Sequence, residues 1–176
     1  SEHRLLLPYV VAVICGGIFT AVWSFWSLDS LPLFTLLVLG ALAVAAESLN
    51  VTMYARTSVS ASATVALAAL LLAGMPGIVF TASAIAIIHY IRQRPQLYKA
   101  VFNWSIHVMT GILPSIFFST ITLDFSPMYT PLWVAACAIA IVPYSFVETG
   151  LIATAISLTT GEKVKDVWRE HFGWLI

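Results

Sequence analysis

The sequence predicts an all-α, polytopic membrane protein with about six transmembrane helices, on the grounds of composition and length. Hydrophobic residues make up 60% of its 176 residues and charged residues only 9%, whereas about 25% of an ordinary soluble domain is charged. A helix needs roughly 20 mostly apolar residues to cross the hydrocarbon core of a bilayer. The length therefore allows about six crossings with short links and leaves no room for a separate soluble domain.

Apolar runs separated by turn signals define the predicted helices, which cover residues 5–26, 33–49, 62–73, 74–91, 97–121 and 132–159. Asp29 and Pro32 break the chain after the first run, and residues 74–77 form a tight turn between the third and the fourth. Pro114 predicts a kink in the fifth helix. The alternating small polar residues at 58–64 either form an extended strand along a polar crevice or cap the third helix.

The positive charges predict the orientation. Every Lys and Arg falls at the amino end, near Arg56, within residues 92–99 or in the tail after Gly161. The alternation of the predicted helices places all of these on one side of the membrane. Because Lys and Arg in short loops stay on the cytoplasmic side, both termini are predicted to be cytoplasmic. The loops with Asp29 and Asp124 then face the opposite side.

The tail divides the chain into a transmembrane domain, residues 1–160, and a short amphipathic segment, residues 161–176. Apolar residues recur in the tail at spacings of three or four, at Val164, Trp168, Phe172 and Leu175. A helix with this pattern and basic residues on its other face lies in the membrane interface. Because the sequence stops on apolar residues, we expect the tail to lead into a further C-terminal region.

Polar side chains within the predicted helices are the candidates for a ligand-binding site, because they are costly in the membrane and usually face the bundle interior. By helical rise, Glu148 lies about 17 Å and His107 about 15 Å from the cytoplasmic ends of their helices, so the two can meet. Asn103 lies one turn before His107 on the same face. Such a group can hold a polar ligand or relay a proton. It can equally serve only as a hydrogen-bonded link between helices.

Three further residues complete the candidate ligand-binding set. Ser62 and Thr64 would line the polar crevice if residues 58–64 are extended. Glu47 lies near the cytoplasmic end of the second helix, where the lower cost of charge favours a boundary salt bridge with Arg56. Cys15 and Cys137 both fall in apolar runs, so no disulfide or metal site is predicted. The identity of any cofactor stays open.

Enzymatic and nucleic-acid-binding functions find no support in the sequence. It contains no HExxH zinc motif, no GxSxG nucleophile elbow and no Walker loop. Its eight Lys and Arg balance its eight Asp and Glu, so no overall field attracts a polyanion. An intramembrane enzyme is only the third hypothesis, because one Glu and one His do not define a reaction.

Residues 58–111 and 142–176 resemble the multi-helix membrane input region that precedes HD-GYP and GGDEF domains in bacterial cyclic-dinucleotide signalling proteins. The most specific pieces are the basic loop leading into Phe102 and Asn103, and the segment from Gly161 to Trp168. The resemblance implies a sensory domain in the bacterial inner membrane, with a cytoplasmic output domain or a homodimer as its partner. His107 and Glu148 stand where this family would have amides, so no ligand is carried over from it.

A weaker resemblance links the small polar segment before LLLAG, residues 70–74, to the substrate-binding S components of energy-coupling-factor vitamin transporters. Two functions therefore follow as hypotheses: a sensory, ligand-binding input domain, and a substrate-binding subunit of a transporter. Both imply the lipid bilayer and a small or lipophilic molecule as partners.

Overall fold

The computed structural model describes residues 3–26, 33–48, 51–53, 57–59, 62–122 and 130–172. In these ranges the elements are α1 His3–Trp26, α2 Leu33–Ser48, β1 Val51–Met53, β2 Thr57–Val59, α3 Ser62–Gln93, α4 Leu97–Thr110, α5 Ile112–Thr122, α6 Thr130–Thr160 and α7 Val164–Phe172. By length and composition, four stretches among these described residues are long and apolar enough to cross a membrane, namely Leu5–Trp26, Thr64–Gln93, Leu97–Phe118 and Ala138–Thr160. The predicted class of a helical membrane protein agrees with this arrangement.

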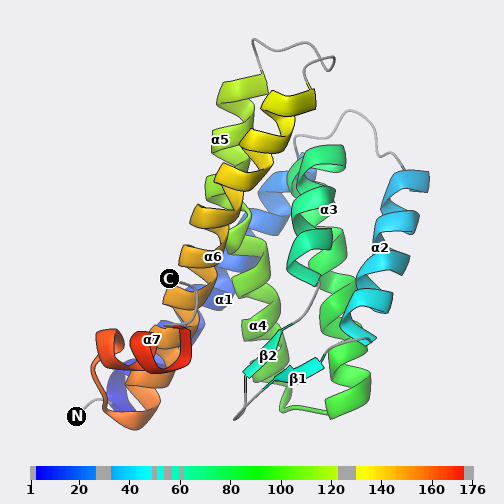
Figure 1. Cartoon of the computed structure of the whole chain (residues 1–176). Helices are drawn as coiled ribbons and strands as arrows, with labels where there is room; N and C mark the ends of the chain where they lie inside the picture. Colours follow the sequence, from blue (N-terminus) through cyan, green and yellow to red (C-terminus); the bar gives the residue numbers. More distant parts are fainter. Residues whose placement is uncertain are drawn as a thin grey trace.

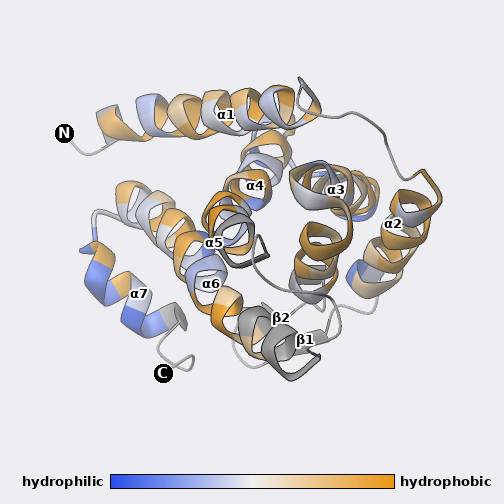
Figure 2. Cartoon of the chain, turned by 90° about the horizontal axis from the view of Figure 1, so that it is seen from above, coloured by the Kyte–Doolittle hydropathy of each residue, from blue (hydrophilic) through white to orange (hydrophobic). Residues whose placement is uncertain are grey.

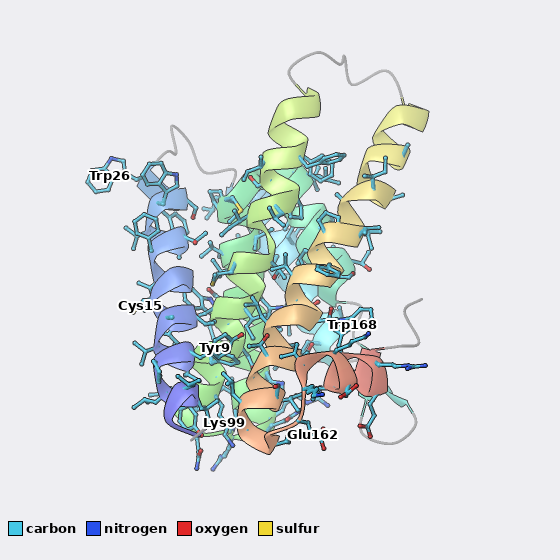
Figure 3. All side chains as sticks on the ribbon, turned by 90° about the vertical axis from the view of Figure 1, so that its left-hand side faces the viewer. Tyr9, Cys15, Trp26, Lys99, Glu162 and Trp168 are labelled. Carbon is cyan, nitrogen blue, oxygen red and sulfur yellow. The ribbon has the colours of Figure 1, made fainter. Side chains whose placement is uncertain are left out.

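The long helices run up and down beside one another (Figure 1). The start of α1, the β1–β2 hairpin, the α3–α4 link and α7 lie towards the lower end in this view. In Figure 3, Lys99 and Glu162 lie at the lower end of the bundle, and Trp26 lies at the upper end of α1. Seen from above, α4 lies inside the bundle (Figure 2), where it contacts α1, α3 and α6. The basic segments around residues 92–99 and 163–169 therefore lie towards the same end.

Helix α3 consists of two antiparallel arms that meet at Gly74. This glycine has φ 63° and ψ −157°, a backbone conformation that residues with a Cβ rarely adopt. A Cβ added at Gly77 would press on the carbonyl of Ala69. Residues eight apart in a straight helix are about 12 Å apart, so this contact requires the chain to reverse. The predicted turn at residues 74–77 is confirmed. The first arm is about 18 Å long, shorter than a hydrocarbon core.

The helix is interrupted near Pro114, where a kink was predicted: α4 ends at Thr110 and α5 begins at Ile112. Pro114 has no N–H to offer the carbonyl of Thr110, and its ring crowds that carbonyl. Helix α6, in contrast, continues through Pro143. The predicted fifth helix is thus divided into α4 and α5, and the sixth is a single long helix.

The segment before α3 is extended in part, as one of the two predicted alternatives has it, while the residues that would cap α3 lie outside the described ones. Residues Thr57–Val59 form strand β2, which pairs antiparallel with β1 and places Ser58 opposite Thr52. Helix α3 then begins at Ser62. The extended part is thus a short hairpin, and the helix starts within the alternating run.

The outer surface of the bundle is apolar, and its interior contacts rely on small residues. Large side chains such as Phe19, Trp23 and Phe34 are exposed, in keeping with a surface that faces lipid. Between α1 and α4, Gly17 lies against the buried Ser105. Small residues at such contacts let membrane helices approach closely.

Helix α7 turns away from the axis of α6 and packs back on its side (Figures 1 and 3). Gly161, with φ 80°, ends α6. The Trp168 Nε1–H then donates a hydrogen bond to Thr149 Oγ1 at 3.1 Å. The predicted tail helix is present, but the face that it packs against α6 is not the predicted face of Val164, Trp168 and Phe172. Val167 is buried and Val164 is 43% exposed, because the face turned to α6 is centred one residue before Trp168. Leu175 lies outside the described residues.

The α1–α4 contact gives a matched pair of glycine substitutions. A Cβ at Gly17 would lie 2.7 Å from the Cα of Ser105, whereas a Cβ at Gly150 meets nothing within 4 Å. Gly17→Ala should lower the free energy of unfolding by about 1–3 kcal/mol through overpacking. Gly150→Ala should raise it by about 0.5–1 kcal/mol. Equilibrium unfolding in mixed detergent micelles measures both changes, and effects of the same sign would contradict the close approach of α1 and α4.

Candidate functional site

His107 and Glu148 are brought together between α4 and α6. The His107 Nδ1 atom lies 3.3 Å from Glu148 Oε1, and the two side chains are 25% and 22% exposed. The two helices are antiparallel neighbours, so residues at similar heights on facing sides come into contact. An imidazole with hydrogen on Nδ1 donates to the carboxylate whether or not the ring is charged. The prediction that this pair meets is confirmed.

The pair lies at a cavity of about 650 Å³ between α1, α4 and α6, which we call the lower cavity. Helix α4 contributes Lys99, Asn103 and His107, which are spaced four residues apart and so share one face. Walls from α1 and α6 are largely apolar and include Leu6, Val10, Ile152 and Ile156. The cavity is therefore amphipathic: one polar stripe faces apolar walls. Asn103 is exposed along this stripe.

Tyr9 fixes the wall where α1 meets the other two helices. Its hydroxyl donates a 2.7 Å hydrogen bond to the carbonyl of Leu151 on α6. Its ring meets Phe102 of α4 edge-on, with centroids 6.1 Å apart. Figure 3 shows Tyr9 between the helices, above Lys99. One side chain thus ties α1 to both helices that carry the His107–Glu148 pair.

Tyr144 is a polar residue of the site region that the sequence analysis missed. It lies one turn before Glu148 on α6 and is 1% exposed. Its hydroxyl is buried and has no hydrogen-bond partner within the described part of the chain. The Thr110 hydroxyl lies near the Tyr144 hydroxyl, but its own proton is donated to the carbonyl of Ile106 at 2.7 Å. In the sequence, only its spacing of four residues from Glu148 indicates that Tyr144 lies near the pair.

Thr64 lies elsewhere, in a second cavity of about 260 Å³ that we call the upper cavity. Its lining comes from α3, α5 and α6 and consists of Thr64, Leu67, Ala68, Leu71, Phe118, Ile141, Tyr144 and Ser145. Ser62 is the first residue of α3, and its side chain lies outside the described residues. The predicted crevice of Ser62 and Thr64 is thus not brought to the His107–Glu148 pair.

Glu47 belongs to a separate cluster between α2 and α3. Its Oε1 lies 3.6 Å from His89 Nδ1. Arg92 donates to the carbonyls of Glu47, at 3.3 Å, and Ser48, at 3.2 Å, so it satisfies the last carbonyls of α2. Arg56, the predicted partner of Glu47, lies outside the described residues. This cluster stabilises a helix end and contributes no residue to the lower cavity.

The chain shows no similarity that supplies a function for this site. No protein-family model, curated protein or solved structure with which it was compared matches it. Across the described ranges, no three His, Cys, Asp or Glu residues gather so that they could hold a metal ion. The site must therefore be interpreted from its own geometry.

Substitution of Glu148 tests the pair. Glu148→Leu leaves the His107 Nδ1–H without an acceptor in a mostly buried position, so it should lower the free energy of unfolding by about 1–3 kcal/mol. Glu148→Gln keeps an acceptor of the same shape and should lower it by less. Equilibrium unfolding measures both, with Glu162→Leu as the control because Glu162 is exposed. Equal losses in the two leucine variants would contradict a stabilising contact.

Proposed function

We propose that this chain is a membrane-embedded domain that binds a small organic solute in the lower cavity and transmits binding through α7. One observation carries the proposal: the His107–Glu148 pair lines a largely apolar cavity of about 650 Å³. Ligand sites of roughly 300–1,000 Å³ typically combine apolar walls with a few convergent polar groups. A pair that served only to join helices would not need an open cavity beside it.

The lining favours an amphipathic solute. Lys99 offers a cation near the lower end, Asn103 offers both a donor and an acceptor, and the pair offers a carboxylate. Leu6, Val10 and the α6 isoleucines face the apolar part of the solute. A small molecule with an anionic or zwitterionic head and a short apolar body matches this distribution.

Six spans with both termini in the cytoplasm are the proposed topology, in the inner membrane of a bacterium. The gathering of the basic segments towards the lower end supports this orientation. Helix α7 indicates where the membrane surface lies. Its Trp168 donates a hydrogen bond to Thr149 of α6, while the basic residues in and next to it, Lys163, Lys165 and Arg169, are exposed. Charged side chains avoid the hydrocarbon core, so we place the cytoplasmic boundary at the lower end, where α7 and Lys99 lie. The lower cavity is then reachable from the cytoplasm.

The route of transmission runs along two consecutive residues of α6. Glu148 contacts His107, and the next residue, Thr149, accepts the hydrogen bond from Trp168 of α7. Phe146 of α6 also packs against Trp168, with ring centroids 6.4 Å apart. A solute that shifts Glu148 would therefore also shift the docking of α7. A cytoplasmic output domain after the tail, or a second copy of the chain, is the proposed receiver, as the resemblance to cyclic-dinucleotide signalling proteins implies.

A substrate-binding subunit of a transporter is the second candidate. A transport site must be reachable from both sides of the membrane. The upper cavity favours this function, because it lies above the lower cavity along α6 and so on the side away from the basic segments. The full-length sequence separates the two candidates: a signalling domain after residue 176 supports the sensor. Copurification with ATPase subunits supports the transporter.

Mass spectrometry of the molecules that the purified protein retains tests the binding proposal. The wild-type protein should release a small amphipathic compound after denaturation, and Glu148→Gln should retain at least about tenfold less, a loss of about 1.4 kcal/mol in binding free energy. Glu47→Gln is the matched control, because Glu47 also lies beside a histidine but outside the lower cavity. If wild type and Glu148→Gln release the same compounds in the same amounts, the pair does not bind the solute.

A further inference from the structure

The two cavities lie along one continuous face of α6. Ile141 and Ser145 line the upper cavity, and Glu148 and Ile152 line the lower one. These positions are spaced three or four residues apart, so their side chains form a single stripe along the helix. The opposite wall follows the same order, with His107 of α4 below and Phe118 of α5 above. The cavities are therefore successive parts of one seam between α6 and the α4–α5 rod.

Tyr144 lies on the seam at the point where the two cavities are separated. It belongs to the lining of the upper cavity and is one turn from Glu148 of the lower cavity. Thr110, one turn beyond His107, faces it from α4. Both Tyr144 and Thr110 are fully buried, so this pair of residues closes the seam.

The closed arrangement leaves the Tyr144 hydroxyl buried without a hydrogen-bond partner among the described residues. A buried polar group that makes no hydrogen bond destabilises the state in which it is buried. A phenylalanine would fill the same space without this penalty. Movement of Tyr144 towards either cavity would let water or a polar solute bind the hydroxyl and would remove this penalty.

We propose that the upper cavity is a second entrance to the His107–Glu148 site and that the Tyr144 side chain is the gate between them. The entrance extends towards the upper end of the bundle, since Leu71 in its lining lies three residues before the Gly74 turn. The solute class is the small amphipathic molecule proposed for the lower cavity, and the volume of about 260 Å³ limits its size. This inference rests on the proposed function for the identity of the solute only.

Thiol labelling of reconstituted full-length protein tests the gate without any solute. Cys15 and Cys137 are replaced by Ser, and Ile152→Cys serves as the reporter because Ile152 lines only the lower cavity. A membrane-impermeant methanethiosulfonate is added at the upper side, with a thiol scavenger at the lower side. Tyr144→Ala should raise the labelling rate of this cysteine at least tenfold. Tyr144→Phe, which removes the orphaned hydroxyl and keeps the ring, should lower the rate about fivefold or more below that of Tyr144.

Two controls separate gating from loosened packing. Leu67→Ala enlarges the upper cavity from α3, a different helix from that of Tyr144, and should change the rate less than twofold. Ser145→Cys should be labelled from the upper side with Tyr144 in place. Labelling from the lower side should be the same in all gate variants, which shows that they are folded. An unchanged rate from the upper side in Tyr144→Ala, or labelling of Ser145→Cys from the lower side alone, overturns the gate. Neither result depends on whether a retained compound is found.

Discussion

The contact between His107 and Glu148 is the interaction on which the rest of the structure depends. It joins α4, the helix inside the bundle, to α6, the helix on which α7 docks. In a helix bundle with an outer surface as apolar as this one, polar side chains are stabilised by partners inside the bundle. The same constraint accounts for Tyr9 on the carbonyl of Leu151 and for Trp104 on Ser83, at 3.0 Å. Each of these contacts links two helices.

The position of Tyr144 shows where this constraint is not met. Its hydroxyl lies within one helical turn of Glu148, yet it has no partner in the part of the chain that the structure describes. Unsatisfied polar groups of this kind occur at sites that move or bind. The pair and the buried hydroxyl thus lie one turn apart on α6, and Tyr144 also lines the upper cavity. Helix α7 docks next to the pair, because its Trp168 donates a hydrogen bond to Thr149, the residue after Glu148.

The sequence predicted the position of a residue along its helix axis better than the side of the helix on which its side chain lies. The rise per residue is fixed, so counting along two antiparallel helices was enough to bring His107 to Glu148. Gly74 turns the chain within α3, and the carbonyl of Thr110, where α4 ends, is the one that Pro114 cannot bond; both places were predicted from local backbone geometry. Directions around a helix depend on which neighbours it packs against. Glu47 and Thr64 therefore lie in other places than the predicted site. Tyr144 was missed because nothing in a sequence shows that a hydroxyl lacks a partner.

A solid-state NMR distance measurement in lipid bilayers tests the central contact most directly. Rotational-echo double-resonance between ¹⁵N-labelled histidine and ¹³C-labelled glutamate carboxyl groups reports the separation of the two side chains, with Glu148→Gln as the subtraction control. The His107–Glu148 coupling should correspond to the 3.3 Å separation of Nδ1 and Oε1 and should vanish in the control spectrum. A folded protein whose spectrum is the same with and without Glu148 would contradict the joining of α4 to α6 by this pair.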